Sequence, residues 1–204
     1  MPRDPDWLLA SVFPGPDSRP RCAWCTQDPL YLAYHDQEWG RPLSDDLALF
    51  ELLCLEGAQA GLSWFTILKK RENYRQAFDR FDPEKMAAYG PEKTASLLAD
   101  AGIVRNRLKV QAFIDNARAY LAIVQAPGDF RDYLWRFTEG RTLRNNWKSL
   151  GEIPASTPKS DRMAKELKKA GFRFVGSTIC YAFMQSAGMV DDHIVGCWCK
   201  GDAA

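Results

Sequence analysis

The sequence predicts an all-α fold, and three observations lead to this prediction. Apolar residues recur at helical spacing in several segments, and capping residues or prolines stand where these segments would begin. We find no run with the period-two alternation of a strand and no internal repeat at a fixed period. The clearest helix spans about 106–124, where one face is apolar: Val110, Phe113, Ile114, Ala117 and Leu121.

The first helix is expected from Ser44, which would cap a first turn containing Asp45 and Asp46. Its apolar face would be formed by Leu47, Phe50 and Cys54. Gly57 and Gly61 are expected to break this helix and to allow close approach by a ligand or a DNA strand. A second helix follows from Ser63, with Trp64, Ile67 and Leu68 on one side.

The pairs Asp82-Pro83 and Gly90-Pro91 have the form of helix starts with proline at the first position. The segment from 94 is expected to end as a helix at Gly102, and a short basic turn, 102–107, leads to the long helix. The remaining segments are an apolar patch at 130–137, a long loop at 140–158, a basic helix from Ser160 to Gly171 and a buried helix over 178–187.

Composition narrows the class of protein. The 204 residues are 46% hydrophobic, as in an ordinary globular protein, and the six cysteines are too few for a disulfide scaffold. The net charge of +1 does not indicate a partner. The proline-rich residues 1–21 are expected to form an extended arm, 22–199 a single domain, and 200–204 a short tail. Without a signal peptide or membrane span, we expect a cytoplasmic protein with reduced cysteines.

The two histidines each lie close to a cysteine, at the spacings Cys22-x12-His35 and His193-x3-Cys197. Four such ligands would close one tetrahedral zinc site and join the two ends of the sequence. Two alternatives remain open at this point. One is a pair of unrelated histidines with cysteines that are simply buried. The other is a four-cysteine site made of Cys22, Cys25, Cys197 and Cys199.

Four aromatic residues lie within sixteen positions: Trp24, Tyr31, Tyr34 and Trp39. They would suit stacking on a nucleobase, although for any one of them a place in the core is the commoner role. Glu56 is either a solvated charge at a helix end or a buried acceptor facing a pocket. The turn 102–107 is either an ordinary helix connection or a hairpin whose amides hold a DNA phosphate.

Several segments together closely resemble the DNA-3-methyladenine glycosylase I family. The resemblance spans roughly 22–199 and is carried by segments 22–24, 28–40, 55–64, 69–75, 174–181 and 192–197. It implies a helix–hairpin–helix glycosylase fold whose termini are joined by one structural zinc ion. The ligands it implies are Cys22, His35, His193 and Cys197, which favours this set over the four-cysteine site.

The resemblance also implies where DNA and base bind. The base pocket would be formed by Tyr34, Trp39, Glu56 and Trp64, with Trp24 and Tyr31 nearby. A loop that wedges into DNA falls on Gln59, Gly61 and Leu62, and the hairpin falls on Gly102, Arg105 and Arg107. Three features depart from the family pattern: the longer arm before Cys22, an alanine at Ala182, and the extra thiols of Cys25 and Cys199.

The implied function is excision of 3-methyladenine from double-stranded alkylated DNA by a monomeric enzyme without strand cleavage. The free base would be the product, Glu56 the catalytic carboxylate, and no membrane would be involved. Two other classes of protein remain as alternatives: a damage-binding or abasic-DNA-binding protein of the same fold without excision activity, and a zinc-stapled protein-interaction module.

Overall fold

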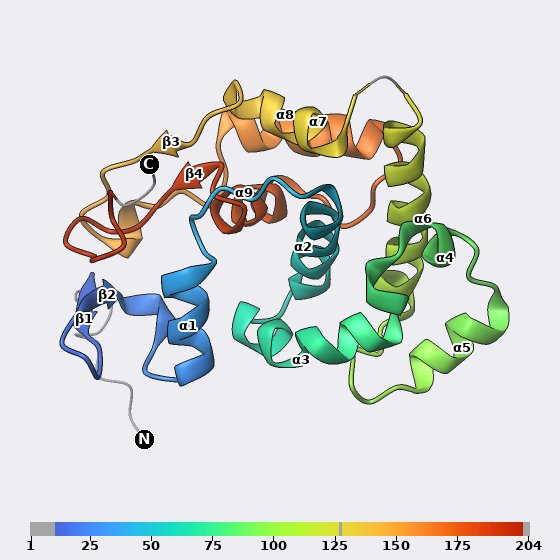
Figure 1. Cartoon of the computed structure of the whole chain (residues 1–204), viewed down its shortest axis with the longest axis horizontal. Helices are drawn as coiled ribbons and strands as arrows, with labels where there is room; N and C mark the ends of the chain where they lie inside the picture. Colours follow the sequence, from blue (N-terminus) through green and yellow to red (C-terminus); the bar gives the residue numbers. More distant parts are fainter. Residues whose placement is uncertain (1–10, 127, 202–204) are drawn as a thin grey trace. The chain divides into compact units, whose positions relative to one another are not determined.

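The computed structural model describes residues 11–126 and 128–201. These residues are mostly helical, as predicted, and their strands are short (Figure 1). The chain divides into two compact units by its internal contacts. Met1–Pro42, Arg141–Ala155 and Met184–Ala204 form the first unit, and Leu43–Gly140 with Ser156–Phe183 forms the second. The first unit therefore draws on segments far apart in the sequence.

The second unit is built around one long helix, α6 (Arg107–Val124), which packs against several others. Phe113 of α6 lies among aromatic rings, with centroids 4.7 Å from Phe78 and 5.8 Å from Tyr74. The other elements of this unit are α2 (Asp46–Gln59), α3 (Trp64–Ala77), η3 (Asp79–Phe81), α4 (Pro83–Ala87), α5 (Pro91–Ala99), α7 (Phe130–Trp135), η4 (Arg136–Thr138), α8 (Pro158–Lys169) and most of α9 (Ser177–Ser186).

Three predicted helix starts, at Ser63, Asp82 and Asn106, are confirmed by their capping contacts, whereas the predicted basic helix begins earlier, at Pro158, with Thr157 as its cap. Asp82 accepts hydrogen bonds from the Glu84 and Lys85 amides at the start of α4, and Asn106 accepts one from the Lys109 amide at the start of α6. Both residues satisfy amides that the first turn of a helix leaves without a partner.

Two details of α2 differ from the prediction. The cap is Asp45, whose side chain accepts from the Ala48 amide at 2.8 Å, so Leu47 falls in the first turn and is exposed. The helix also continues through Gly57, which is not among the glycines with positive φ. A Cβ at Gly57 would meet the Phe174 Cβ at 3.2 Å. The glycine thus admits a neighbouring side chain of the same unit, where we expected an external ligand.

Gly102 differs from the prediction in a similar way. Helix α5 ends at Ala99, and Gly102 is not among the glycines with positive φ. A Cβ at Gly102 would lie 3.1 Å from the Asn73 Cβ and 2.9 Å from the Asp100 Oδ1. Its missing side chain therefore lets α3 approach the loop between α5 and α6.

The first unit contains the strands and one helix that the sequence analysis did not predict. β1 (Val12–Pro14) pairs antiparallel with β2 (Pro20–Cys22), and β3 (Leu143–Arg144) pairs parallel with β4 (Val190–Asp191). Strands of two or three residues are too short to show a period-two pattern. The first pair occupies part of the predicted arm, of which residues 1–10 lie outside the described residues. The other elements are η2 (Ala23–Cys25), α1 (Pro29–Gln37) and η5 (Leu150–Glu152).

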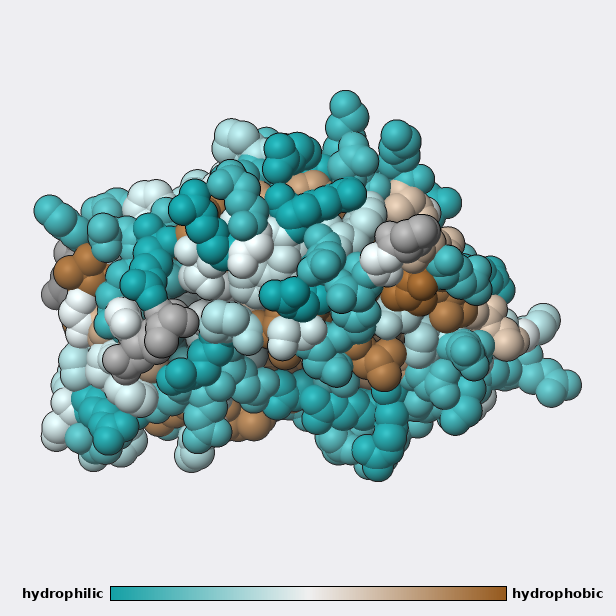
Figure 2. All heavy atoms as spheres, turned by 45° about the horizontal axis from the view of Figure 1, so that its top comes forward, coloured by the Kyte–Doolittle hydropathy of each residue, from teal (hydrophilic) through white to brown (hydrophobic). Residues whose placement is uncertain are grey.

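Among the described residues, no helix is long and apolar enough to cross a membrane. The face shown in Figure 2 is mostly hydrophilic, and hydrophobic residues show on it only in separate areas. The exposed large hydrophobic residues of the described chain are Leu30, Leu47, Leu62, Leu108 and Val195.

Candidate functional site

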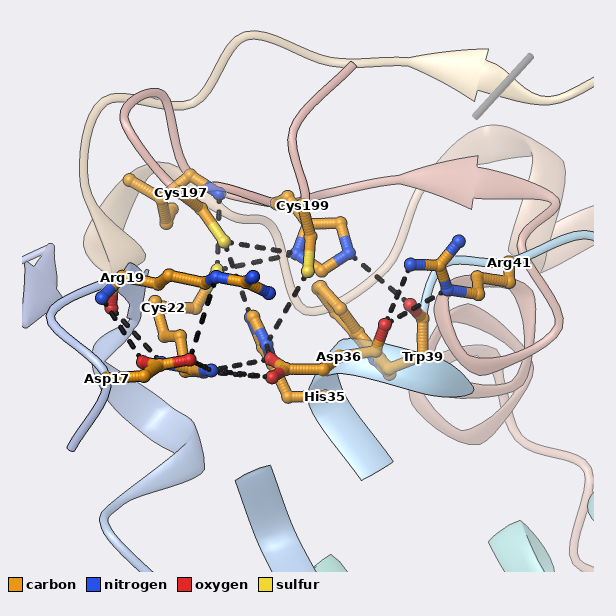
Figure 3. Close-up of polar contacts among 12 residues, drawn as sticks. Asp17, Arg19, Cys22, His35, Asp36, Trp39, Arg41, Cys197 and Cys199 are labelled. Carbon is orange, nitrogen blue, oxygen red and sulfur yellow. Dashed lines mark hydrogen bonds and ion pairs between the residues drawn. The ribbon is translucent and has the colours of Figure 1, made fainter. Parts of the chain in front are cut away.

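Four buried side chains of the first unit meet at one point. Cys22 ends β2, His35 lies on α1, and His193 and Cys197 follow β4. Cys197 Sγ lies 3.5 Å from His35 Nε2 and 3.6 Å from His193 Nδ1. Cys22 Sγ lies 3.7 Å from His193 Nδ1, and all four ligand atoms lie within 4.8 Å of one another (Figure 3). The fold thus brings together the predicted Cys2His2 set.

These distances fit a single four-coordinate ion. Zinc–sulfur bonds of about 2.3 Å and zinc–nitrogen bonds of about 2.0 Å, set at tetrahedral angles, place sulfur and nitrogen about 3.5 Å apart. Three of the four sulfur–nitrogen pairs lie 3.5, 3.6 and 3.7 Å apart. Two thiols and two imidazoles are also donors of the type that zinc prefers.

The second nitrogen of each imidazole has a fixed partner. His35 Nδ1 lies 2.8 Å from Asp36 Oδ1, and His193 Nε2 lies 3.3 Å from the Trp39 carbonyl oxygen. In metal sites such partners select the tautomer that points the free nitrogen at the ion. The second contact is possible because residue 40 is glycine: with φ at +75°, a Cβ at Gly40 would lie 2.9 Å from His193 Nε2.

Asp36 is itself held by Arg21, which is buried. The Arg21 guanidinium donates from Nε to Asp36 Oδ1 at 2.9 Å and from Nη2 to Oδ2 at 2.7 Å, and it also donates to Asp17. Burial raises the pKa of Asp36, but hydrogen bonds from Arg21 and His35 outweigh burial and lower it. No role was predicted for Arg21 or Asp36 from the sequence, although each directly neighbours a predicted ligand.

Cys25 and Cys199 lie close to this cluster but outside it. Cys199 Sγ lies 3.9 Å from His35 Nδ1, the nitrogen that contacts Asp36. The other nitrogen of this ring, Nε2, contacts Cys197. Burial raises the pKa of Cys25 to about 12, so this thiol stays protonated. Neither cysteine belongs to the four-ligand group found in the described part of the chain.

The predicted aromatic cluster forms around Trp24. Its ring centroid lies 5.1 Å from Tyr31, 4.9 Å from Trp39 and 6.4 Å from Tyr34, all edge-on. Trp24 and Tyr31 are half-buried, and Tyr34 and Trp39 are buried. The Tyr34 hydroxyl donates to Ser186 Oγ at 3.0 Å.

The aromatic cluster also packs on the two ligand imidazoles. The Trp24 centroid lies 5.3 Å from His35, and the Trp39 centroid lies 4.7 Å from His193 at an interplanar angle of 89°. The cluster and the four possible metal ligands therefore share one packed region, in which the position of each ring depends on the others.

The remaining predicted pocket residues belong to the second unit. Glu56 is buried in the last turn of α2, and Trp64 is half-buried at the first position of α3. Between the two helices runs a tight loop. The Leu62 amide donates to the Gln59 carbonyl at 2.7 Å, and Gln59 Nε2 donates to the Leu62 carbonyl at 2.8 Å. This loop leaves Leu62 exposed.

A lysine that the sequence analysis missed holds the start of this loop. Lys109 Nζ donates to the carbonyl oxygens of Ala58 at 2.7 Å and Ala60 at 2.6 Å. Burial lowers the pKa of Lys109. The signal was present in the sequence, because Lys109 falls beside Val110 and Phe113 on the apolar face of α6.

The loop between α5 and α6 is the predicted hairpin, and α3 holds it. Lys70 Nζ donates to the carbonyl oxygens of Ala101 at 2.9 Å and Gly102 at 3.1 Å. The Val104 amide donates to the Tyr74 hydroxyl at 3.1 Å. Of the predicted DNA contacts on this loop, Gly102 is half-buried, whereas Arg105 and Arg107 are exposed.

The fold and the site define a helical protein with a buried Cys2His2 cluster, and comparison with known proteins identifies its family. The model of the methyladenine glycosylase family matches residues 24–200, so the chain belongs to this family. This confirms the resemblance found in the sequence.

The relatives are similar along most of their length. The chain is 56% identical to DNA-3-methyladenine glycosylase 1 of Escherichia coli (strain K12) over 179 residues, which are 88% of this chain and 96% of that protein. A crystal structure of 3-methyladenine DNA glycosylase I is 57% identical, with a TM-score of 0.87 over 88% of this chain and 99% of that one. A structure addressing 3-methyladenine recognition by the Staphylococcus aureus enzyme is 39% identical, with a TM-score of 0.87 over 90% and 98%.

Proposed function

We propose that this chain is a monofunctional DNA N-glycosylase that excises 3-methyladenine from alkylated double-stranded DNA and leaves an abasic site. The observation that carries the proposal is the family match over residues 24–200, together with 56% identity to a protein named for this activity. The enzyme would act as a monomer in the cytoplasm and release the free base as its product.

The chemistry of the substrate explains why aromatic residues are suited to this task. Methylation at N3 gives adenine a positive charge and weakens its glycosidic bond. The enzyme therefore needs to recognise the base more than to activate the bond. The damaged nucleotide is flipped out of the duplex, which is least costly for a poorly stacked base. We propose that the rings of Tyr34 and Trp64 stack on the cationic base, because the face of an aromatic ring attracts cations. Trp39, Trp24 and Tyr31 would support this contact.

Glu56 is the proposed catalytic residue. It is a buried carboxylate in the last turn of α2. A hydrogen bond to a charged acceptor is stronger away from water, so Glu56 would bind the adenine edge tightly as an acceptor. It would favour the protonated form of the departing base. Water would then capture the oxocarbenium-like sugar, and without an amine nucleophile the DNA strand stays intact.

DNA would be held by two loops of the second unit. The exposed Leu62, with Gln59 and Gly61, would enter the duplex beside the flipped nucleotide. The α5–α6 connection would act as the hairpin of a helix–hairpin–helix motif, in which Gly102, Arg105 and Arg107 contact the backbone. Phosphate contacts of this kind give affinity without reading sequence.

We assign one structural zinc ion to Cys22, His35, His193 and Cys197. Three sulfur–nitrogen distances of 3.5–3.7 Å, the burial of all four residues and the partners of both imidazoles support this assignment. When bound, the ion would join β2, α1 and the segment after β4. The protein supplies all four ligands, so the ion has no catalytic part.

The test is release of 3-methyladenine from methylated double-stranded DNA, with 3-methylguanine and 7-methylguanine measured in the same digest. We expect release of 3-methyladenine well above its spontaneous rate, and a strand that breaks only after alkali. Tight binding to abasic DNA without base release would identify a damage-binding protein and contradict the proposal. A protein with no salt-dependent affinity for DNA would instead be an interaction module.

A further inference from the structure

Lys109 is a buried cation that the proposed chemistry does not use. Its residue is 8% exposed, and its ammonium donates to the carbonyl oxygens of Ala58 and Ala60 at 2.7 and 2.6 Å. Burying an ammonium is unfavourable unless its hydrogen bonds are satisfied. The two hydrogen bonds to these carbonyls are therefore what allows the Lys109 ammonium to be buried.

The two carbonyls lie where α2 ends and the exposed loop begins. The last carbonyls of a helix have no partner within the helix and carry partial negative charge, which a cation stabilises. Ala60 is the residue at which the backbone leaves α2, with φ −46° and ψ 118°. Lys109 thus holds the Ala58 carbonyl at the end of α2 and the carbonyl of the first residue outside the helix.

The loop beyond Ala60 has little freedom once its first residue is held. Gln59 and Leu62 exchange two hydrogen bonds, Gly61 adopts a φ of +77°, and the Ser63 hydroxyl accepts from the Thr66 amide at 3.2 Å to begin α3. Leu62 is presented to solvent between these two fixed ends. Its direction is therefore set by the position of Ala60.

Lys109 also belongs to the first turn of α6, directly after the hairpin. The Asn106 side chain accepts from the Lys109 amide at 3.1 Å, so the backbone of this lysine is tied to the end of the hairpin loop. One residue therefore links the two loops of the second unit that we assign to DNA binding: its backbone belongs to the hairpin helix, and its side chain holds the loop that carries Leu62.

We infer that Lys109 is a positioning residue, which aligns the Gln59–Leu62 loop with the hairpin so that Leu62 enters the duplex as the hairpin grips the backbone. The inference rests on the proposed function. It predicts that loss of Lys109 impairs the steps that need DNA and leaves binding of the free base intact.

The test compares Lys109→Met and Lys109→Arg with Lys165→Met, which removes an exposed lysine of α8 as a matched control. Single-turnover release of 3-methyladenine, affinity for a duplex with a tetrahydrofuran abasic analogue, and affinity for free 3-methyladenine are measured for each. We expect Lys109→Met to lose about tenfold or more in both DNA measurements, since small misplacements are costly. Free-base affinity should stay within about twofold in all variants. Lys109→Arg can still donate to both carbonyls and should therefore lose less than Lys109→Met.

A double-mutant cycle with Leu62→Ala separates positioning from a general loss of stability. If Lys109 acts through the loop, Leu62→Ala should slow release markedly in the wild type and much less in Lys109→Met. Additive losses, a wild-type rate in folded Lys109→Met, or loss of free-base binding in step with excision would overturn the inference. If Lys109→Met does not fold, Lys109→Gln takes its place in the same measurements. A wild-type protein that releases no base contradicts the proposed function itself and not the role of Lys109.

Discussion

Cys197 Sγ lies 3.5 Å from His35 Nε2, although the two residues are 162 positions apart in the sequence. The contact joins the segment after β4 to α1, the helix that also carries Tyr34 and Tyr31. Because the aromatic cluster packs on His35, any ion that holds Cys197 and His35 together also fixes the cluster.

Removal of the metal is expected to destabilise the protein. A ligand present at about 100 times its Kd stabilises a fold by about 2.7 kcal/mol. For a chain of this size, losing that stabilisation lowers Tm by about 5–11 °C. We expect one zinc per chain in the purified protein by elemental analysis, and a fall in Tm of this order after chelation or in Cys197→Ser. Cys25→Ser is the control and should keep its zinc. A wild-type protein without stoichiometric zinc would contradict the assignment.

Gly40→Ala is expected to weaken metal binding without touching a ligand. The left-handed backbone at φ +75° costs a non-glycine residue about 1–2 kcal/mol. The new Cβ would also lie 2.9 Å from His193 Nε2 and push the imidazole away. Competition with a zinc chelator should show lower affinity in this variant. Gly151→Ala is the matched control, since a Cβ there meets nothing within 4 Å. Equal zinc affinity in the two variants would count against this account of Gly40.

Lys70→Met is expected to loosen the loop between α5 and α6. The Lys70 ammonium holds the carbonyls of Ala101 and Gly102, and one net charge-assisted hydrogen bond is worth about 1.5–3 kcal/mol. Amides of residues 101–106 should therefore exchange at least about tenfold faster with solvent. Lys69→Met is the control. The Lys69 ammonium lies over the Phe65 ring, 4.6 Å from its centroid, and it is Lys70 that donates to the Ala101 and Gly102 carbonyls. Unchanged exchange in Lys70→Met would show that the loop needs no support from α3.

Asp79→Asn tests a pH dependence of stability. The Tyr89 hydroxyl and Lys93 ammonium hydrogen-bond to Asp79 and lower its pKa. A lowered carboxyl pKa gives stability that is fully present above the unfolded value of about 3.9 and is lost as pH falls toward the folded value. We expect the wild type to exceed Asp79→Asn by about 1 kcal/mol at neutral pH, since the group is partly exposed. Urea unfolding from pH 7 to pH 3 should show this difference shrinking below pH about 4. A difference that grows toward low pH would contradict the sign.

The elements that the sequence predicted are those whose signals are local. Asn106 and Asp82 mark helix starts because capping is decided by the residue and its next few neighbours. Helix α1 carries the same signal, Asp28 followed by Pro29, although no helix was predicted there. β1 to β4 gave no signal, because strands of two or three residues depend on pairing with distant segments.

The candidate site shows the same division. The spacing of the two cysteine–histidine pairs indicated a possible Cys2His2 site, and the family resemblance favoured it over the alternatives. No role was predicted for Arg21 and Asp36, because a charged residue is usually solvated and its sequence neighbours do not reveal burial. Lys109 was missed for the first reason alone, since its place on the apolar face of α6 did indicate burial. Their roles follow from contacts across the fold: Arg21 to Asp36 within the first unit, and Lys109 to Ala58 and Ala60 within the second.

The most direct test of the central claim is single-turnover release of 3-methyladenine from methylated duplex DNA by the wild type and by Glu56→Gln. The variant keeps the shape of the side chain and removes its charge. A charge-assisted hydrogen bond worth about 1.5–3 kcal/mol corresponds to about a 10- to 150-fold loss of rate. We predict rapid release by the wild type and a loss of this size in Glu56→Gln, with abasic-DNA affinity unchanged. Wild-type-like release by Glu56→Gln, or no release by the wild type, would contradict the account.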